Sequence, residues 1–332
     1  MSAILVDQIE KTFRQKKHVP GAMASLRAMF TPTYIDIRAV DGVSFQIAAG
    51  DTVGYLGPNG AGKSTMMKMM TGILVPSGGR LTVLGRTPHK DRRSNAFEIG
   101  VVFGQRSQLW WDLPAVASFE LSKRMHRIPE AQYMANLGRF TDMLDLGGIM
   151  KRPVRKLSLG QRMRCEIVMA LLHSPKILFL DEPTIGLDVV AKEQVRNFLR
   201  EINCADGVTL FLTSHDMQDI ESLCSRMLIV DNGKLIFDGD LPQLRDSMGA
   251  MRRLKLQFAH PVGPFEIPGL QNVAGEGLKR DFLVTRKDIL LPELLALLPA
   301  NLPLADLRLE DPNTDDIVRD FYRRKPDAHQ RS

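Results

Sequence analysis

The chain has 332 residues, enough to bury a large core and to form more than one domain. Hydrophobic residues make up 44% and charged residues 25%, a balance that is typical of globular proteins and argues against a disordered or fibrous chain. The net charge of +6 is compatible with a nucleic-acid partner or an anionic membrane surface, but a solvated surface explains so small an excess more simply.

Cysteine usage and hydropathy indicate a cytoplasmic protein. Cys165, Cys204 and Cys224 have no metal-ligand spacing, and we expect them to be reduced. The N-terminus is not a signal peptide, and no apolar run reaches the roughly 18 to 20 residues that cross a bilayer. Residues 290–304 come closest, but prolines and a glutamate interrupt them. If the protein acts at a membrane, we expect another chain to supply the spanning part.

The first part of the chain predicts two strands separated by an insertion. Residues 3–13 predict the first strand, and alternating apolar residues predict another at 39–47. Residues 14–38 form a polar, basic insertion in which three apolar residues have helical spacing, which predicts a short amphipathic helix.

A phosphate-binding loop follows the next predicted strand, at 52–56, and precedes a predicted helix at 66–74. Its glycines let the backbone curl so that N–H groups converge on phosphate oxygens, and the helix start adds its positive dipole end. The lysine can reach the β- and γ-phosphates, and the serine hydroxyl can ligate Mg²⁺. The predicted nucleotide-binding residues are Gly57, Pro58, Asn59, Gly60, Ala61, Gly62, Lys63, Ser64 and Thr65.

Beyond this loop, strands and helices alternate, which predicts a parallel sheet with helices on both faces. A helical subdomain, at about 106–160, interrupts the alternation. The expected strands are 80–84, 98–103, 176–181, 208–214 and 226–230, and the expected helices are 160–172, 189–202 and 216–224.

The composition shifts after about residue 248, and the remainder predicts a small α+β domain. We expect a disordered tail from Lys325. The expected strands are 251–258, 281–285 and 305–310, and the expected helices are 291–298 and 314–323.

Two acids follow the apolar strand at 176–181. A buried strand would present Asp181 at its carboxyl end, where it can hold Mg²⁺, usually through water. Glu182 is then placed to polarise an attacking water. The alternative is a strand followed by a solvated acidic turn, but the phosphate loop upstream favours a catalytic pair.

Other polar residues lie at the ends of predicted elements. Ser158 is a candidate helix N-cap, and the small Gly160 would let a phosphate approach the helix start, although capping alone explains the pattern. Gln105 and His215 each follow a strand, and either one alone would more often be a structural polar residue.

Together these pieces resemble the ATP-binding-cassette (ABC) ATPase family over about residues 3–245. The resemblance implies an α/β fold: a P-loop NTPase cassette with a parallel core sheet, an antiparallel β subdomain and an inserted helical subdomain. It implies an ATP-binding domain at 1–246 and an α+β accessory domain at 247–332. Two motifs depart from the family pattern: Leu159 replaces a glycine, and Ile185-Gly186 replaces a common Ser-Ala.

The resemblance also implies ATP and Mg²⁺ as cofactors and a head-to-tail pair of cassettes that sandwiches ATP. Glu182 would be the general base, His215 would hold the γ-phosphate, and the metal ligands would be Ser64, Gln105 and Asp181. The second subunit would supply Ser158 and Gly160 to the same γ-phosphate, and Gln161 would also bind nucleotide. Asp188, a further nucleotide-site residue, would lie at the interface and couple the two sites.

An aromatic residue near the first strand normally stacks on adenine in this family. Phe13 follows Glu10-Lys11-Thr12, as the family's aromatic residue often follows its first strand. Tyr34 is the rival, because the insertion makes the spacing ambiguous. We favour Phe13.

The C-terminal stretch 306–317 loosely resembles the ATPase subunits of ABC-2-type bacterial exporters, and 102–114 resembles a subgroup linked to cationic drugs and viologens. This implies a separate ABC-2-type membrane permease and a second ABC ATPase, identical or different, at the cytoplasmic face of the bacterial plasma membrane, with peripheral attachment. No nucleic acid is expected. The alternative is a soluble cassette ATPase that acts on nucleic acid or ribosomes.

Two surface features could meet the permease or the membrane. The only tryptophans, Trp110 and Trp111, lie where family members receive the permease's coupling helix, but they could equally pack the helical subdomain onto the core. The insertion at 14–38 resembles one that polysaccharide exporters place near the membrane surface, and a mobile surface loop is its alternative.

Overall fold

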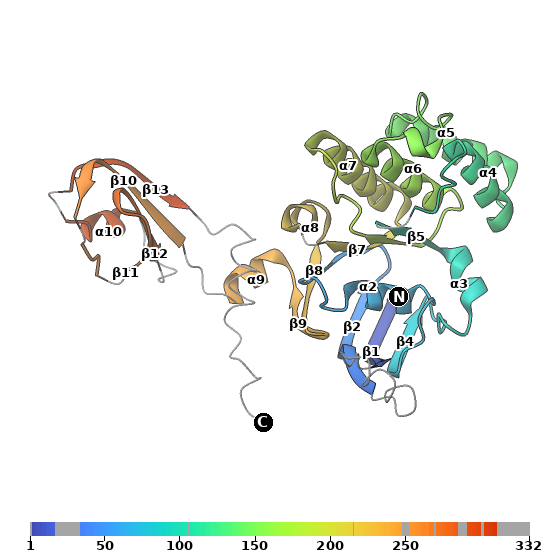
Figure 1. Cartoon of the computed structure of the whole chain (residues 1–332), viewed down its shortest axis with the longest axis horizontal. Coiled ribbons are helices and arrows are strands. Elements are labelled where there is room, and N and C mark those ends of the chain that lie inside the picture. The colour runs from blue at the N-terminus through green and yellow to red at the C-terminus, as the bar shows by residue number, and fades with distance from the viewer. Residues whose placement is uncertain are drawn as a thin grey trace, which may run out of the picture. The chain divides into compact units, whose positions relative to one another are not determined.

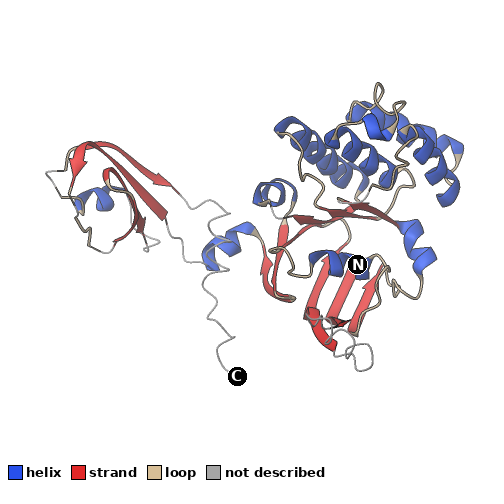
Figure 2. Ribbon diagram, viewed as in Figure 1, coloured by secondary structure: helices blue, strands red, loops and turns tan. Residues whose placement is uncertain are grey.

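The computed structural model of the chain consists of two compact units, Met1–Gly239 and Asp240–Ser332 (Figures 1 and 2). The division falls a few residues before the boundary expected at 246. Several predictions lie outside the described residues: Gln105, His215, the helix within the insertion, the terminal helix and the tail. The structure describes residues 2–16, 34–104, 107–214, 216–247, 252–263, 265–268, 270–284, 291–299 and 302–310.

A six-stranded sheet forms the centre of the first unit, in the order β5-β6-β7-β3-β8-β9. Every neighbouring pair is parallel except the β8–β9 hairpin, so the predicted parallel core sheet is confirmed. Its inner strands are apolar because both faces are covered. The strands are β3 (Thr52–Leu56), β5 (Ile99–Phe103), β6 (Ile177–Asp181), β7 (Thr209–Ser214), β8 (Arg226–Asp231) and β9 (Lys234–Gly239).

A separate antiparallel sheet, in the order β2-β1-β4, forms the β subdomain. It contains β1 (Ser2–Lys16), β2 (Tyr34–Ala48) and β4 (Gly78–Val83). The predicted strands, 3–13 and 39–47, are shorter than β1 and β2, because the pairing of the two strands continues until Lys16 lies opposite Tyr34. The side chains of Phe13 and of residues 34–38 are exposed. Residues 35–38 alternate apolar and polar side chains, a strand pattern, but the predicted insertion at 14–38 includes them.

Helices cover both faces of the core sheet (Figure 2). Helix α2 lies between the two sheets, and the methionines within it belong to their shared core, as expected. The others lie on the opposite face or at the ends of the core sheet, and α4 and α5 form the helical subdomain. The helices are α2 (Lys63–Met70), α3 (Arg92–Glu98), α4 (Ala115–His126), α5 (Glu130–Met143), α6 (Leu159–Leu171), α7 (Val189–Asp206) and α8 (Met217–Leu223).

The second unit is a four-stranded antiparallel sheet in the order β11-β12-β10-β13, with a core that includes Phe258 and Phe282. This confirms a small α+β unit, although β11 was not predicted, because its residues follow a Gly/Pro-rich connection. The elements are α9 (Leu241–Ser247), β10 (Arg252–Val262), β11 (Leu270–Ala274), β12 (Gly277–Val284), α10 (Leu291–Ala296) and β13 (Leu304–Glu310).

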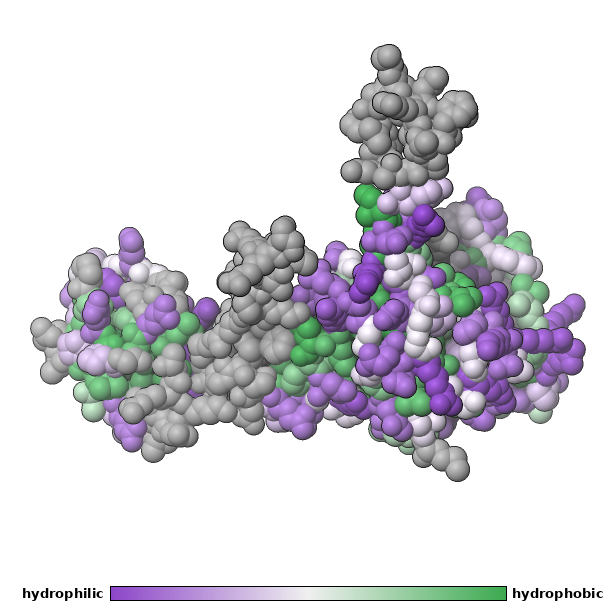
Figure 3. Space-filling model, turned by 90° about the horizontal axis from the view of Figure 1, so that it is seen from below, coloured by the Kyte–Doolittle hydropathy of each residue, from purple (hydrophilic) through white to green (hydrophobic). Residues whose placement is uncertain are grey.

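Hydrophilic residues predominate on the face shown in Figure 3, and apolar residues form separate patches on it. Within the described ranges, no helix is both long and apolar enough to cross a bilayer.

Candidate nucleotide site

The phosphate loop connects β3 to α2, and its last glycine permits a close approach of two backbones. Gly62, the N-cap of α2, has φ +97°, a left-handed conformation that favours glycine. A Cβ atom at Gly62 would lie 2.2 Å from the carbonyl oxygen of Ala39 in β2. The β subdomain therefore reaches the edge of the loop, and Ala39 lines the pocket that the loop forms.

The buried Lys63 curls back over its own loop. Its Nζ donates hydrogen bonds to the carbonyl oxygens of Gly57, at 2.7 Å, and Pro58, at 3.2 Å. Burial lowers the pKa of Lys63, and the nearby charges of Glu182 and Asp181 oppose this shift. An ammonium group held by neutral carbonyl oxygens can exchange them for the charged oxygens of a phosphate, which are stronger acceptors.

Asp181 lies between the phosphate loop and β7, where two hydroxyl groups hold it. Ser64 Oγ donates to Oδ2 at 3.1 Å, and Thr213 Oγ1 donates to Oδ1 at 2.5 Å. The carboxylate thus has one oxygen facing α2 and the other facing the neighbouring strand. The sequence predicted that Ser64 and Asp181 would share one site, and the structure places them in contact.

Glu182 lies beside the same pocket in an unusual backbone conformation. Its φ is +52°, which few residues other than glycine adopt. Its backbone N–H lies 3.0 Å from the carbonyl oxygen of Thr213 and 3.2 Å from Thr213 Oγ1. The pocket is lined by Ala39, Asn59, Gly60, Gly62, Lys63, Ser64, Thr65, Asp181 and Glu182.

Thr213 was not predicted as a site residue. It is fully buried and lies directly opposite Asp181 in the β6–β7 register. Its hydroxyl contacts the Asp181 carboxylate and the Glu182 backbone, so it aligns both acids. A threonine near the carboxyl end of a buried strand was a signal in the sequence, but only the strand order shows what it faces.

The signature segment, residues 158–161, forms the capped start of helix α6. Ser158 is the N-cap of α6, and it forms a capping box with Gln161: the Gln161 N–H donates to Ser158 Oγ at 3.2 Å, and the Ser158 N–H donates to Gln161 Oε1 at 3.1 Å. The predicted N-cap is confirmed. Among the described residues that line the phosphate-loop pocket, none belongs to this segment.

Gln105 and His215 lie outside the described residues, but the residues before them are described. The Gly104 N–H donates to the Asp181 carbonyl oxygen at 2.9 Å, and Ser214 ends β7. Both positions therefore follow strands that flank β6.

The ABC transporter family model matches residues 40–185. NatA, an ABC transporter ATP-binding protein of Bacillus subtilis, is 32% identical over 64% of this chain and 85% of its own length. The chain belongs to the ABC transporter ATP-binding family. The daunorubicin resistance ATP-binding protein DrrA3 of Streptomyces coeruleorubidus is 29% identical and covers 86% of this chain and 91% of its own length.

Solved ABC cassettes share the fold. The dimeric cassette MJ0796 bound to ADP and Pi has a TM-score of 0.60 and 24% identity, over 72% of this chain and 98% of that chain. CbiO1 of Clostridium perfringens has the same TM-score and identity, over 74% of this chain and 91% of that chain. The predicted P-loop cassette fold is thus confirmed. The family match also confirms the prediction that the chain is an ABC ATPase.

The two departures from the ABC pattern are neighbours in space. Gly186 has φ +69°, and a Cβ atom there would lie 2.7 Å from Leu159 Cδ2. The leucine side chain therefore fills the space that an alanine methyl group at 186 would need. In this cassette the signature segment and the loop at 185–188 are packed as a matched pair.

Asp188 ends that loop and starts the following helix. It is the N-cap of α7, and its Oδ1 accepts a hydrogen bond from the Ala191 N–H at 2.8 Å. The cap joins the loop to α7, so a displacement of one would move the other.

Replacing Thr213 with valine should lower the kcat of ATP hydrolysis by about tenfold or more, because both acids lose an aligning hydroxyl. Thr213→Ser keeps the hydroxyl and should retain most of the activity. Steady-state ATPase assays of the purified chain test this. Equal activities of the valine and serine variants would contradict the aligning role.

Proposed function

We propose that this chain is the ATPase of an ABC-2-type exporter, attached peripherally to the cytoplasmic face of a bacterial plasma membrane and coupled to a separate permease. The contact of Ser64 and Thr213 with Asp181 at the phosphate loop carries the nucleotide part of the proposal. The relatives support export: their names concern daunorubicin resistance and Nod factor export.

The residues of the pocket suit Mg²⁺-ATP. The Ser64 hydroxyl and the Asp181 carboxylate are hard oxygen donors, the kind that Mg²⁺ prefers, and substrate phosphates commonly complete its coordination. When bound, the ion would neutralise charge on the β- and γ-phosphates. Gln105, proposed as a further ligand, lies outside the described residues.

Hydrolysis would proceed through the groups that surround the phosphates. Lys63 and the N–H groups of the loop bind the β- and γ-phosphates and stabilise their charge. Glu182 orients a water molecule and accepts its proton as the water oxygen attacks the γ-phosphorus, and the bond to ADP breaks. His215 would hold the γ-phosphate.

A second cassette would complete the site. Ser158, Gly160 and Gln161 open α6, whose N-terminal N–H groups favour an anion, and they lie outside the pocket of their own subunit. In a head-to-tail pair they would face the γ-phosphate bound to the partner, with Asp188 at the interface. ATP would thus close the pair, and hydrolysis would release it.

Phe13 is our proposed adenine contact. It pairs with Ile37 across the β1–β2 hairpin, whereas Tyr34 pairs with Lys16, so the alternation of side chains puts the two rings on opposite faces. The Arg14 guanidinium lies 4.5 Å from the centre of the Tyr34 ring.

We expect Phe13→Ala to raise the Kd of ATP several-fold and Tyr34→Ala to leave this Kd unchanged. A rise in the Kd for Tyr34→Ala alone would reverse the assignment.

Capture of the partner tests the function directly. A tagged chain with Glu182→Gln should bind ATP but hydrolyse it slowly, which holds the closed pair together. Isolated from detergent-solubilised membranes with ATP present, it should retain a multi-spanning membrane protein, identifiable by mass spectrometry. The control is a chain that carries both Glu182→Gln and Lys63→Ala. It should not bind ATP, so it should retain no more of the membrane protein with ATP than without it. Ribosomes or nucleic acid without a membrane protein would contradict the proposal.

The tryptophan pair supports a permease contact. Trp110 and Trp111 are 47% and 53% exposed, and the nearby Leu113 is 42% exposed. The Arg162 guanidinium lies 5.8 Å from the Trp111 ring centre, on the side of α6. Rings exposed to this degree contribute only part of their surface to packing within the chain and leave the rest for a partner.

We expect Trp110→Ala with Trp111→Ala to abolish stimulation of ATPase activity by the captured permease and to leave the basal activity of the isolated subunit within about twofold. Met134→Ala is a matched control, because Met134 is an exposed apolar residue of α5 in the same subdomain. Loss of basal activity together with aggregation of the double variant would instead assign the tryptophans to packing within the chain.

A further inference from the structure

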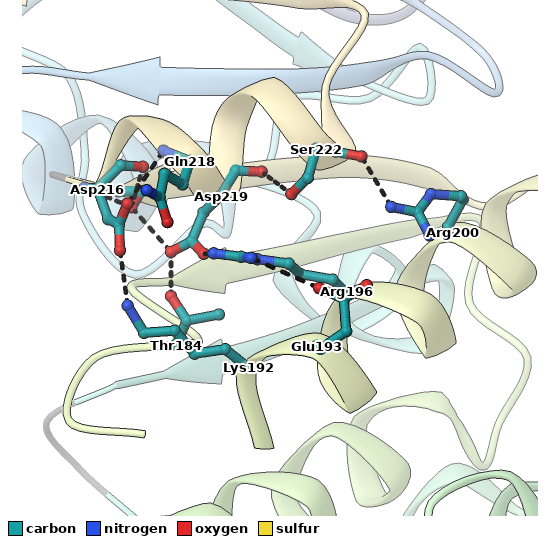
Figure 4. Close-up of polar contacts among 10 residues, drawn as sticks. Thr184, Lys192, Glu193, Arg196, Arg200, Asp216, Gln218, Asp219 and Ser222 are labelled. Carbon is teal, nitrogen blue, oxygen red and sulfur yellow. Dashed lines mark hydrogen bonds and ion pairs between the residues drawn. The ribbon is translucent and has the colours of Figure 1, made fainter. Parts of the chain in front are cut away.

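A buried carboxylate outside the nucleotide pocket joins three elements of the cassette (Figure 4). Asp219 of α8 is fully buried. Arg196 of α7 donates to its Oδ1 from Nε at 2.9 Å and from Nη2 at 2.5 Å. The hydroxyl of Thr184, in the turn that follows β6, donates to its Oδ2. A buried carboxylate is costly without such partners, so these contacts fix one arrangement of the three elements.

A second ion pair strengthens the same junction. Lys192, one helical turn before Arg196, donates to Asp216 at 2.6 Å. Asp216 in turn caps α8 by accepting a hydrogen bond from the Gln218 N–H at 3.0 Å. Helix α7 therefore holds the start of α8 at two points, and α8 presents Asp219 to the turn as a fixed acceptor.

The turn that Thr184 belongs to carries the catalytic glutamate. Glu182 has φ +52°, which is unfavourable for a residue with a side chain and persists only where the surroundings impose it. At one end of the turn, the Glu182 N–H donates a hydrogen bond to the carbonyl oxygen of Thr213 at 3.0 Å. Two residues later, the Thr184 side chain fixes the turn to Asp219, and the Leu187 N–H donates to the Thr184 carbonyl oxygen at 3.2 Å.

We propose that Thr184, Asp219 and Arg196 are positioning residues for ATP hydrolysis: together they hold the turn in the conformation that aims the Glu182 carboxylate at the attacking water. The proposal rests on the proposed function, because it assumes that Glu182 activates water. None of the three residues lines the phosphate-loop pocket, whereas Lys63 and Ser64 do. The three residues therefore affect the rate of hydrolysis by holding the turn, and they do not contact the nucleotide.

The test compares two replacements of one hydroxyl group. Thr184→Val keeps the shape of the side chain but removes the donor to Asp219, and Thr184→Ser keeps the donor. We expect the valine variant to lose kcat on the order of tenfold with the KM for ATP within about twofold. We expect the serine variant to retain at least about half of the parent kcat. Steady-state ATPase assays of the full chain give both constants.

Thr209, the first residue of β7, supplies a matched control, because it lies at the opposite end of the strand from Thr213. Thr209 is buried like Thr184, and its Oγ1 accepts a hydrogen bond from the Gly50 N–H at 2.9 Å. Thr209→Val should lower the melting temperature, as Thr184→Val does, because each variant loses a buried hydrogen bond. Unlike Thr184→Val, it should leave kcat unchanged.

The outcomes separate this inference from the function on which it rests. A parent chain without ATP hydrolysis would refute the function whatever the variants do. With an active parent, a kcat of Thr184→Val equal to that of Thr209→Val would overturn the positioning role, and so would a loss confined to KM. If Thr184→Val does not fold, Asp219→Asn replaces it, since asparagine keeps the shape; its kcat should fall likewise at unchanged KM, and an unchanged kcat would overturn the proposal.

Discussion

The candidate nucleotide site depends on two hydrogen bonds to the Asp181 carboxylate, one from the Ser64 hydroxyl and one from the Thr213 hydroxyl. One hydroxyl belongs to the helix that starts at the phosphate loop, and the other belongs to the strand beside Asp181. These hydrogen bonds therefore fix the distance between the phosphate loop and Glu182, the residue that follows Asp181 and that we propose as the general base. If either hydroxyl moved, the phosphates and the attacking water would no longer share one geometry.

The strand order makes this contact possible. β3 pairs with β7, and β7 pairs with β6, so their carboxyl ends meet at one edge of the sheet. The phosphate loop leaves β3 at that edge, where β6 ends in Asp181. Helix α2 packs its methionines into the core that both sheets share, which anchors the start of the helix from behind. Packing in the core thus sets the position of Ser64.

Much of this was readable from the sequence where a pattern is local. The P-loop motif, the apolar strand before Asp181 and the capping serine at 158 each lie within a few consecutive residues, and the structure contains all three. The role of Thr213 depends on which strand lies beside β6, which no local pattern encodes. Likewise, Leu159 and Gly186 were two separate departures in the sequence, and only the fold shows that they touch. The outer ends of β1 and β2 were missed because residues 14–38 are predicted as one insertion, although residues 35–38 alternate apolar and polar side chains as a strand does.

We infer that Asp181 couples nucleotide binding to a divalent cation, and calorimetry of ATP binding can test this coupling. The chain would carry Glu182→Gln to prevent hydrolysis and would be titrated with ATP in the presence and absence of Mg²⁺. We expect Mg²⁺ to tighten ATP binding and the added Asp181→Asn change to remove most of this gain. Asp206→Asn, at an exposed ion pair with Arg139, should leave the gain intact. An undiminished effect of Mg²⁺ in the Asp181→Asn chain would show that Asp181 does not provide this coupling.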